Sequence, residues 1–122
     1  MKLKKIVDAL PSLRKLAAAD MPLRRLYQVK KLAAALQPEF DFFDEKRKAI
    51  VEKYCDPDNK TEILPENIEK TDVEFKELLD FEVSVKYKAV EIPDSDDIKL
   101  SLNDLKALDG FVKILFTEDE TT

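Results

Sequence analysis

A row of mostly apolar positions recurs at helical spacing, without a change of register, from Asp20 to Cys55. It advances in steps of three and four residues, with one polar member, through Leu26, Val29, Ala33, Leu36, Phe40, Phe43, Arg47, Ile50 and Tyr54. This spacing places the side chains on one stripe of a helix, so it predicts one long amphipathic helix like those of coiled coils. A long apolar stripe predicts a covering partner, either elsewhere in this chain or in another subunit.

Pro38 lies inside this repeat. An interior proline removes a backbone hydrogen bond and clashes with the preceding turn, at about 3 kcal/mol. The sequence therefore predicts a kink at Pro38, or alternatively a break into two helices. Asp20 is the expected N-cap, with Pro22 in the opening turn.

Apolar residues also recur at helical spacing before this segment, at Leu3, Ile6, Val7, Leu10, Leu13, Leu16 and Ala17. Pro11 interrupts the row, which predicts either one bent helix or two short ones.

The second half of the chain alternates turn signals with short periodic segments. Asp56–Asn59 is typical of a turn, and residues 56–70 are expected to form a loop. Thr71 and Glu74 match a capping box and predict a helix to about residue 79. A period of two over residues 82–92 predicts a strand, which residues 98–100 are expected to pair with as an antiparallel hairpin. Ser101 is expected to cap a helix over 102–109 that points Leu102, Leu105 and Leu108 inward, and residues 111–116 form a last apolar run.

Together these segments predict an α+β fold that is mainly α. A long kinked amphipathic helix packs on N-terminal helices, with a small antiparallel β element and a short C-terminal helix. One domain is expected over residues 1–117, made of a helical part (1–55), a loop (56–70) and an acidic α/β part (71–117). Residues 118–122 are expected to be a disordered tail.

Composition supports helices and argues against catalysis. Charged residues make up 39% of the chain and Gly110 is the only glycine, as expected of long helices with a solvated face. The chain has no histidine, and Cys55 is its only cysteine, so a disulfide within the chain and a cysteine–histidine pair are both excluded. Asp94, Asp96 and Asp97 are read as a solvated turn rather than a cation site. We therefore expect no enzyme activity, no cofactor and no metal, and a reducing, cytoplasmic location without a membrane-spanning segment.

Charge is distributed unevenly. Residues 1–38 carry nine basic and two acidic groups, whereas residues 39–122 carry 12 basic and 24 acidic groups. The basic half offers an alternative function, binding of nucleic-acid phosphates through Lys4, Lys5, Arg14, Lys15, Arg24 and Lys31. The simpler interpretation is that these cations flank an acidic neighbour.

Three stretches of the sequence carry a resemblance. The first is Lys-Leu-x-x-Ile-Val-x-Ala-Leu-Pro-x-Leu-x-Lys-Leu-Ala from Lys2, which continues into Asp20-Met21-Pro22-Leu23. The second is Glu52-Lys53-Tyr54 at the end of a charged helix, and the third is a short strand rich in Val and Glu followed by Leu-Ser-x-x-Asp-Leu-x-Ala-Leu over 100–108. In these features it resembles a family of small proteins of unknown function encoded by tailed bacteriophages and prophages. The resemblance implies a viral origin and expression in a bacterial host cytoplasm, and it transfers no catalytic residues.

The expected function is therefore that of a non-enzymatic phage or prophage accessory protein that acts through protein–protein contacts. Such a protein would be a virion assembly factor or chaperone, or a modulator of a host protein. Its partner is expected to be a second copy of the chain, a phage protein or a host protein. The residues expected to contact the partner belong to the stripe: Leu36, Phe40, Phe43, Ile50 and Tyr54.

Overall fold

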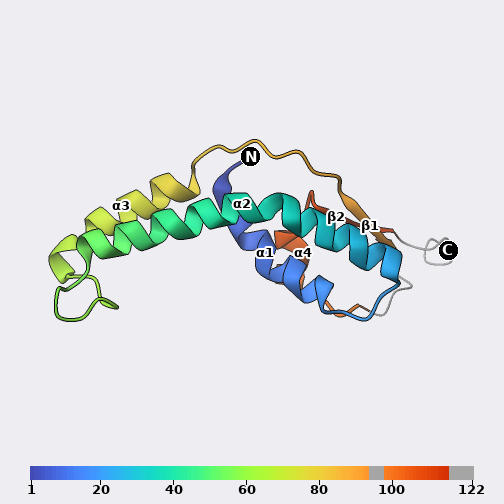
Figure 1. The fold of residues 1–122 in the computed structure, drawn as a ribbon, viewed down its shortest axis with the longest axis horizontal. Coiled ribbons are helices and arrows are strands. Elements are labelled where there is room, and N and C mark those ends of the chain that lie inside the picture. The colour runs from blue at the N-terminus through green and yellow to red at the C-terminus, as the bar shows by residue number, and fades with distance from the viewer. Residues whose placement is uncertain (94–97, 116–122) are drawn as a thin grey trace. The chain divides into compact units, whose positions relative to one another are not determined.

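The computed structural model describes residues 1–93 and 98–115 of the 122-residue chain. Helix accounts for 61% of the structure, which confirms the α+β, mainly α, fold class (Figure 1). The chain forms two compact units. Unit 1 contains residues 1–7 and 38–84, and unit 2 contains residues 8–37 and 85–122. Among the described helices, none is both long enough and apolar enough to cross a membrane.

The N-terminal segment is one helix, α1, spanning Leu3–Ala17. Pro11 lies inside it on the exposed side, while Leu10 and Leu13 on either side of it are fully buried. Burial of such side chains contributes about 1.5–3 kcal/mol each, which offsets the lost backbone bond. The alternative of two short helices is therefore wrong.

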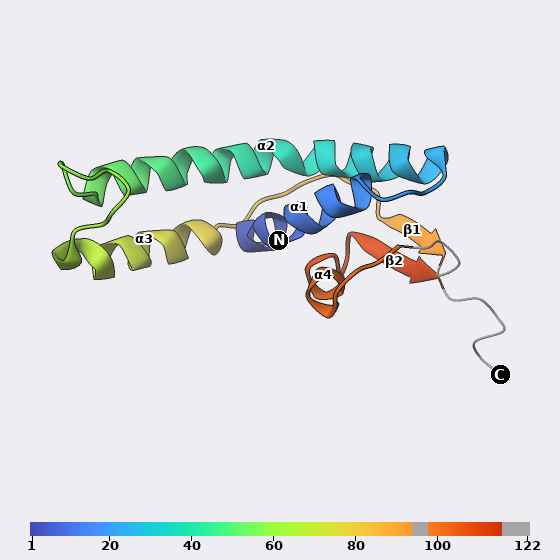
Figure 2. The ribbon, with the colours of Figure 1, turned by 90° about the horizontal axis from the view of Figure 1, so that it is seen from below.

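Helix α2 spans Leu23–Tyr54 and continues through Pro38, so the alternative of a break into two helices is wrong and the long helix is confirmed. All positions of the predicted stripe are buried or partly buried, with Val29 and Leu36 fully buried. Within unit 2, α2 packs on the N-terminal helix as predicted (Figure 2). The rest of the chain therefore covers the stripe fully at Val29 and Leu36 and only in part at its other positions.

Unit 1 is built on a helical hairpin. Residues 38–54 of α2 lead into a turn, a 3-10 helix at Pro65–Asn67 and helix α3 at Ile68–Leu79 (Figure 1). The amide of Asn59 donates to the Asp56 carbonyl at 3.1 Å, which confirms the predicted turn. After α3, the Phe81 carbonyl accepts from the Leu3 amide at 2.8 Å, which joins α1 to the hairpin.

The start of α3 differs from the prediction. Part of the expected 56–70 loop is helical, and Thr71 lies inside α3 rather than at its N-cap. Thr71 is buried, and its hydroxyl donates to the Asn67 carbonyl at 2.9 Å. Pro65 explains the earlier start, because a proline at the first helical position needs no backbone donor and has its φ already set. The division of one domain into a helical part, a loop and an acidic α/β part, with boundaries near residues 55 and 70, stays a prediction.

The β element belongs to unit 2 and is parallel, which corrects the expected antiparallel hairpin. Strand β1, Val90–Pro93, pairs with β2, Val112–Leu115, and Val90 lies opposite Val112. Residues 98–100 form no strand. Parallel strands need a crossover of a dozen or more residues, and the segment containing helix α4 supplies it. The period of two over residues 82–92 does describe an extended chain, but only its last residues find a partner strand.

Helix α4 spans Leu102–Ala107, and Ser101 forms the predicted N-cap, with Asp104 completing a capping box. Leu108 is buried, but Leu102 and Leu105 are exposed, contrary to the prediction that all three point inward. Asp104 explains this outcome, because its carboxylate accepts a hydrogen bond from Ser12 of α1 and so turns its side of α4 toward α1. Leu108, four residues later, lies on the same side, whereas Leu102 lies on the opposite side. The predicted Asp94–Asp97 turn, Phe116 and the tail at 118–122 lie outside the described residues.

Candidate functional site

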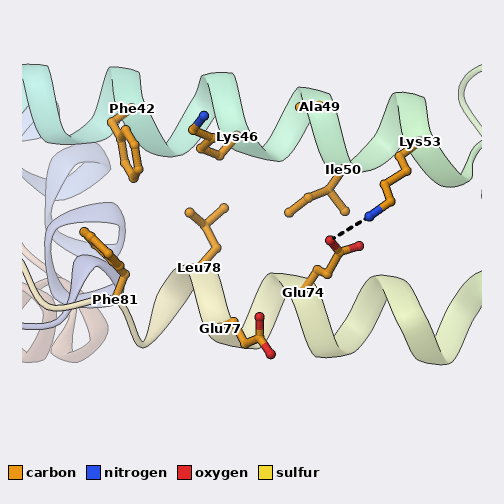
Figure 3. A pocket seen from close by; sticks show the side chains of 9 residues that line it. All are labelled: Phe42, Lys46, Ala49, Ile50, Lys53, Glu74, Glu77, Leu78 and Phe81. Atoms are coloured by element: carbon orange, nitrogen blue, oxygen red, sulfur yellow. Dashed lines mark hydrogen bonds and ion pairs between the residues drawn. The ribbon is translucent and has the colours of Figure 1, made fainter.

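The side of the unit 1 hairpin carries an apolar groove of about 390 Å³. Figure 3 shows side chains from α2 and from α3 and its C-terminal end converging on it. The Phe42 and Phe81 rings close one end with their centroids 5.8 Å apart, and Ile50 and Leu78 lie in the middle. An open apolar groove with a few polar groups is typical of binding sites.

Charges line the groove in two separate rows. Lys46 and Lys53 come from α2, whereas Glu74 and Glu77 come from α3. Lys53 Nζ lies 3.2 Å from Glu74 Oε1, and this ion pair closes the second end of the groove. Lys53 and Glu74 face each other across the groove, whereas the Lys46 ammonium and the Glu77 carboxylate point away from each other (Figure 3).

Glu74 has an unsatisfied oxygen. Its Oε1 accepts from Lys53 at 3.2 Å, whereas its Oε2 is buried and has no hydrogen-bond partner among the described residues. The Tyr54 hydroxyl, followed by the Lys53 ammonium, nevertheless lowers the pKa of Glu74. Glu74, followed by Tyr54, raises the pKa of Lys53 in return. Both groups are therefore charged at neutral pH, and Oε2 is an acceptor that lacks a donor.

The predicted partner-binding residues do not form one surface. Leu36 is fully buried in unit 2, where it is part of the core. Phe40, Phe43 and Tyr54 are partly buried in unit 1, and the Phe40 and Phe43 rings lie 5.9 Å apart. Of the predicted residues, Ile50 is the one that lines the groove.

Sequence reasoning missed the other apolar members of the groove, Phe42, Ala49, Leu78 and Phe81. Phe42, Lys46, Ala49 and Lys53 follow a second helical row, which lies roughly 100° around α2 from the predicted stripe at 100° per residue. The spacing of this row was visible in the sequence. Its two lysines concealed it, although their aliphatic stems cover apolar surface.

The predicted phosphate-binding residues are dispersed. Lys4 and Lys5 belong to unit 1, whereas Arg14, Lys15, Arg24 and Lys31 belong to unit 2. Lys15 Nζ lies 2.7 Å from Asp104 Oδ2, so this cation is neutralised within the chain. The ion pair agrees with the simpler interpretation, in which the basic residues flank an acidic neighbour.

Asp104 organises the contact between α1 and α4 in unit 2. Its Oδ1 accepts from the Ser12 hydroxyl at 2.8 Å, and its Oδ2 accepts from Lys15 and from the Ser101 amide. Lys15, followed by Ser101 and Ser12, holds the pKa of Asp104 well below its usual range. These contacts hold α4 against α1, so the Asp104 carboxylate has a structural role.

Comparison with known protein families, curated proteins and solved structures finds no match for this chain. Within residues 1–93 and 98–115, no cluster of cysteine and carboxylate side chains is arranged to hold a metal ion. The Asp94, Asp96 and Asp97 cluster lies outside these residues.

Proposed function

We propose that this chain is a non-enzymatic phage or prophage accessory protein that acts through protein–protein contacts, beginning with a second copy of itself. The observation that carries the proposal is the hairpin groove, with its cations on one helix and its carboxylates on the other. The sequence resemblance supports the viral origin, and with it a place in the bacterial cytoplasm. Roles in virion assembly, as a chaperone, or in modulating a host protein all use such a surface.

The charge pattern of the groove is self-complementary. A second copy turned by 180° about an axis parallel to the helices lays its α2 over α3 of the first. Lys46 of each copy then approaches Glu77 of the other, and Lys53 approaches Glu74. A closed twofold interface requires this self-complementarity.

Unit 1 buries few of its apolar side chains completely. Among the described residues of unit 1, the fully buried apolar side chains are Leu3 and Ile6, and both come from α1. The groove leaves Phe81, just after the C-terminal end of α3, 52% exposed. A second hairpin packed over the groove covers this surface and produces a four-helix arrangement, in which facing helices bury each other's apolar rows.

Charge exchange tests the pairing directly. Lys46→Glu and Glu77→Lys each place like charges opposite one another in the proposed dimer, so each single variant is expected to dimerise more weakly than the wild type. The double variant restores opposite charges and is expected to regain the dimer. Sedimentation equilibrium at several protein concentrations measures the four dissociation constants, those of the wild type, the two single variants and the double variant.

Lys60→Glu is the matched control, because it makes the same charge change at an exposed turn residue outside the groove. It is expected to leave the dissociation constant close to the wild-type value. A wild-type chain that stays monomeric at high concentration contradicts the proposal. So does a double variant that is no better than the single ones.

A further inference from the structure

Unit 2 contains a second, larger groove that the proposed self-association does not use. It lies between the first half of α2 and the extended residues 86–91 that lead into β1, and its volume is about 830 Å³. Figure 1 shows this extended segment, in orange, running beside α2. Arg24, Gln28, Lys31 and Ala35 line it from α2 at i, i+4, i+7 and i+11, which is one helical face.

The groove is strongly basic in an acidic protein. Arg24 and Lys31 line it from the helix, and Lys86 and Lys88 line it from the extended segment. Glu91 is the one carboxylate among the lining residues. None of the four cations forms an ion pair with a described carboxylate, in contrast to Lys15, which Asp104 neutralises. Residues two apart in an extended chain project to the same side, so Lys86 and Lys88 form a row opposite the helical cations.

An exposed aromatic ring accompanies these charges. Tyr27 lines the groove and is 63% exposed, and Lys31 Nζ lies 5.8 Å from the centroid of its ring. Tyr87 is already engaged, because its ring packs on Phe111 at 5.0 Å and its hydroxyl donates to the Gly110 carbonyl. Tyr27 therefore offers a face on which a planar group can stack.

We propose that this groove binds single-stranded nucleic acid, with Arg24, Lys31, Lys86 and Lys88 contacting phosphates and Tyr27 stacking on a base. Cations along a groove together with an exposed aromatic ring are the features by which proteins hold single strands. A duplex is a poor occupant, because its bases are paired and stacked inside the helix and cannot reach Tyr27. Other cations of residues 1–38, such as Lys4, Lys5 and Arg14, lie outside the groove, so variants of the groove residues are needed to show where the strand binds.

Fluorescence anisotropy with a labelled oligothymidine measures the affinity at several salt concentrations. Each neutralised phosphate of a single strand contributes about 0.7 to the slope of log affinity against log salt, so four contacts predict a slope of about −3. Competition with unlabelled thymidine monophosphate and with duplex DNA completes the measurement. The single strand is expected to compete far more strongly than either.

Two variants separate the two kinds of contact. Lys86→Gln with Lys88→Gln is expected to reduce the magnitude of the salt slope by about 1.4, because two phosphate contacts are lost. Tyr27→Ala is expected to weaken binding roughly 5- to 100-fold, the range for one stacked base, while leaving the slope nearly unchanged. Tyr27 is mostly exposed, so its removal is not expected to unfold unit 2.

Lys60→Gln with Lys70→Gln is the matched control, because it removes the same charge from exposed positions of unit 1. It is expected to leave affinity and slope close to wild type. The proposal is overturned if the wild type does not bind oligothymidine at low salt, or if the control weakens binding as much as the groove variant. It is also overturned if the monophosphate or the duplex competes as well as the single strand.

Discussion

Phe81→Ser tests whether the hairpin groove is an interface or ordinary surface. Phe81 is 52% exposed, and full burial of such a side chain is worth about 1.5–3 kcal/mol, so a partner that covers the exposed half gains about 0.8–1.6 kcal/mol per copy. A twofold dimer contains this residue twice, and the loss is about 2–3 kcal/mol per dimer. The dimer is therefore expected to dissociate roughly 30- to 150-fold more readily.

Sedimentation equilibrium measures that change, and circular dichroism checks that the helices persist. They are expected to persist because Phe81 follows the end of α3, and its backbone carbonyl still accepts from the Leu3 amide. Leu23→Ser is the matched control, since Leu23 is 82% exposed but belongs to unit 2. Equal weakening by both variants, or no weakening by Phe81→Ser, would refute the assignment of the groove as the interface.

Other substitutions probe the stripe, the Asp104 anchor and the cysteine. Changing Phe40 and Phe43 together to Ser is expected to lower the oligomer mass in light scattering while much of the helix signal survives; outright unfolding of a strictly monomeric protein would show that both are ordinary core. Leu36→Ala is expected to destabilise the fold by about 2–5 kcal/mol in urea unfolding, because Leu36 is fully buried, and a loss below about 1 kcal/mol would contradict that burial. Because the pKa of Asp104 is lowered in the folded protein, its contribution to stability is fully present above pH about 4 and is lost as the pH falls. Asp104→Asn is therefore expected to reduce the fall in unfolding free energy at acidic pH. An unchanged fall would argue against this coupling. Cys55→Ser is expected to leave oligomer mass and nucleic-acid binding unchanged, since the thiol is partly buried and its contact is with the Glu52 carbonyl; loss of either activity with the fold preserved would contradict this.

Features that depend on near neighbours were predictable from the sequence. The 3–4 spacing of α2, the turn at Asp56 and the Ser101 cap each involve residues that are at most four positions apart. Local signals failed where two of them competed, as at Thr71, where Pro65 begins the helical segment earlier. At Pro11 and Pro38 local signals left open whether the helix continues or breaks, and burial of neighbouring side chains, which offsets the local cost of proline, decided for one helix.

Contacts between distant residues were decided only by the tertiary structure. The sequence by itself determined that Val90 and Ile92 alternate with polar residues, but the crossover through α4 made Val112 and Ile114 their partners. Phe42 and Phe81 are apolar in any sequence reading, yet only the closure of the α2–α3 hairpin brings their rings to 5.8 Å. Likewise, Lys86 and Lys88 join Arg24 and Lys31 only because the extended segment lies along α2. Periodicity specifies which face of an element is apolar, whereas the choice of the face that covers it depends on packing and charge complementarity over the whole chain.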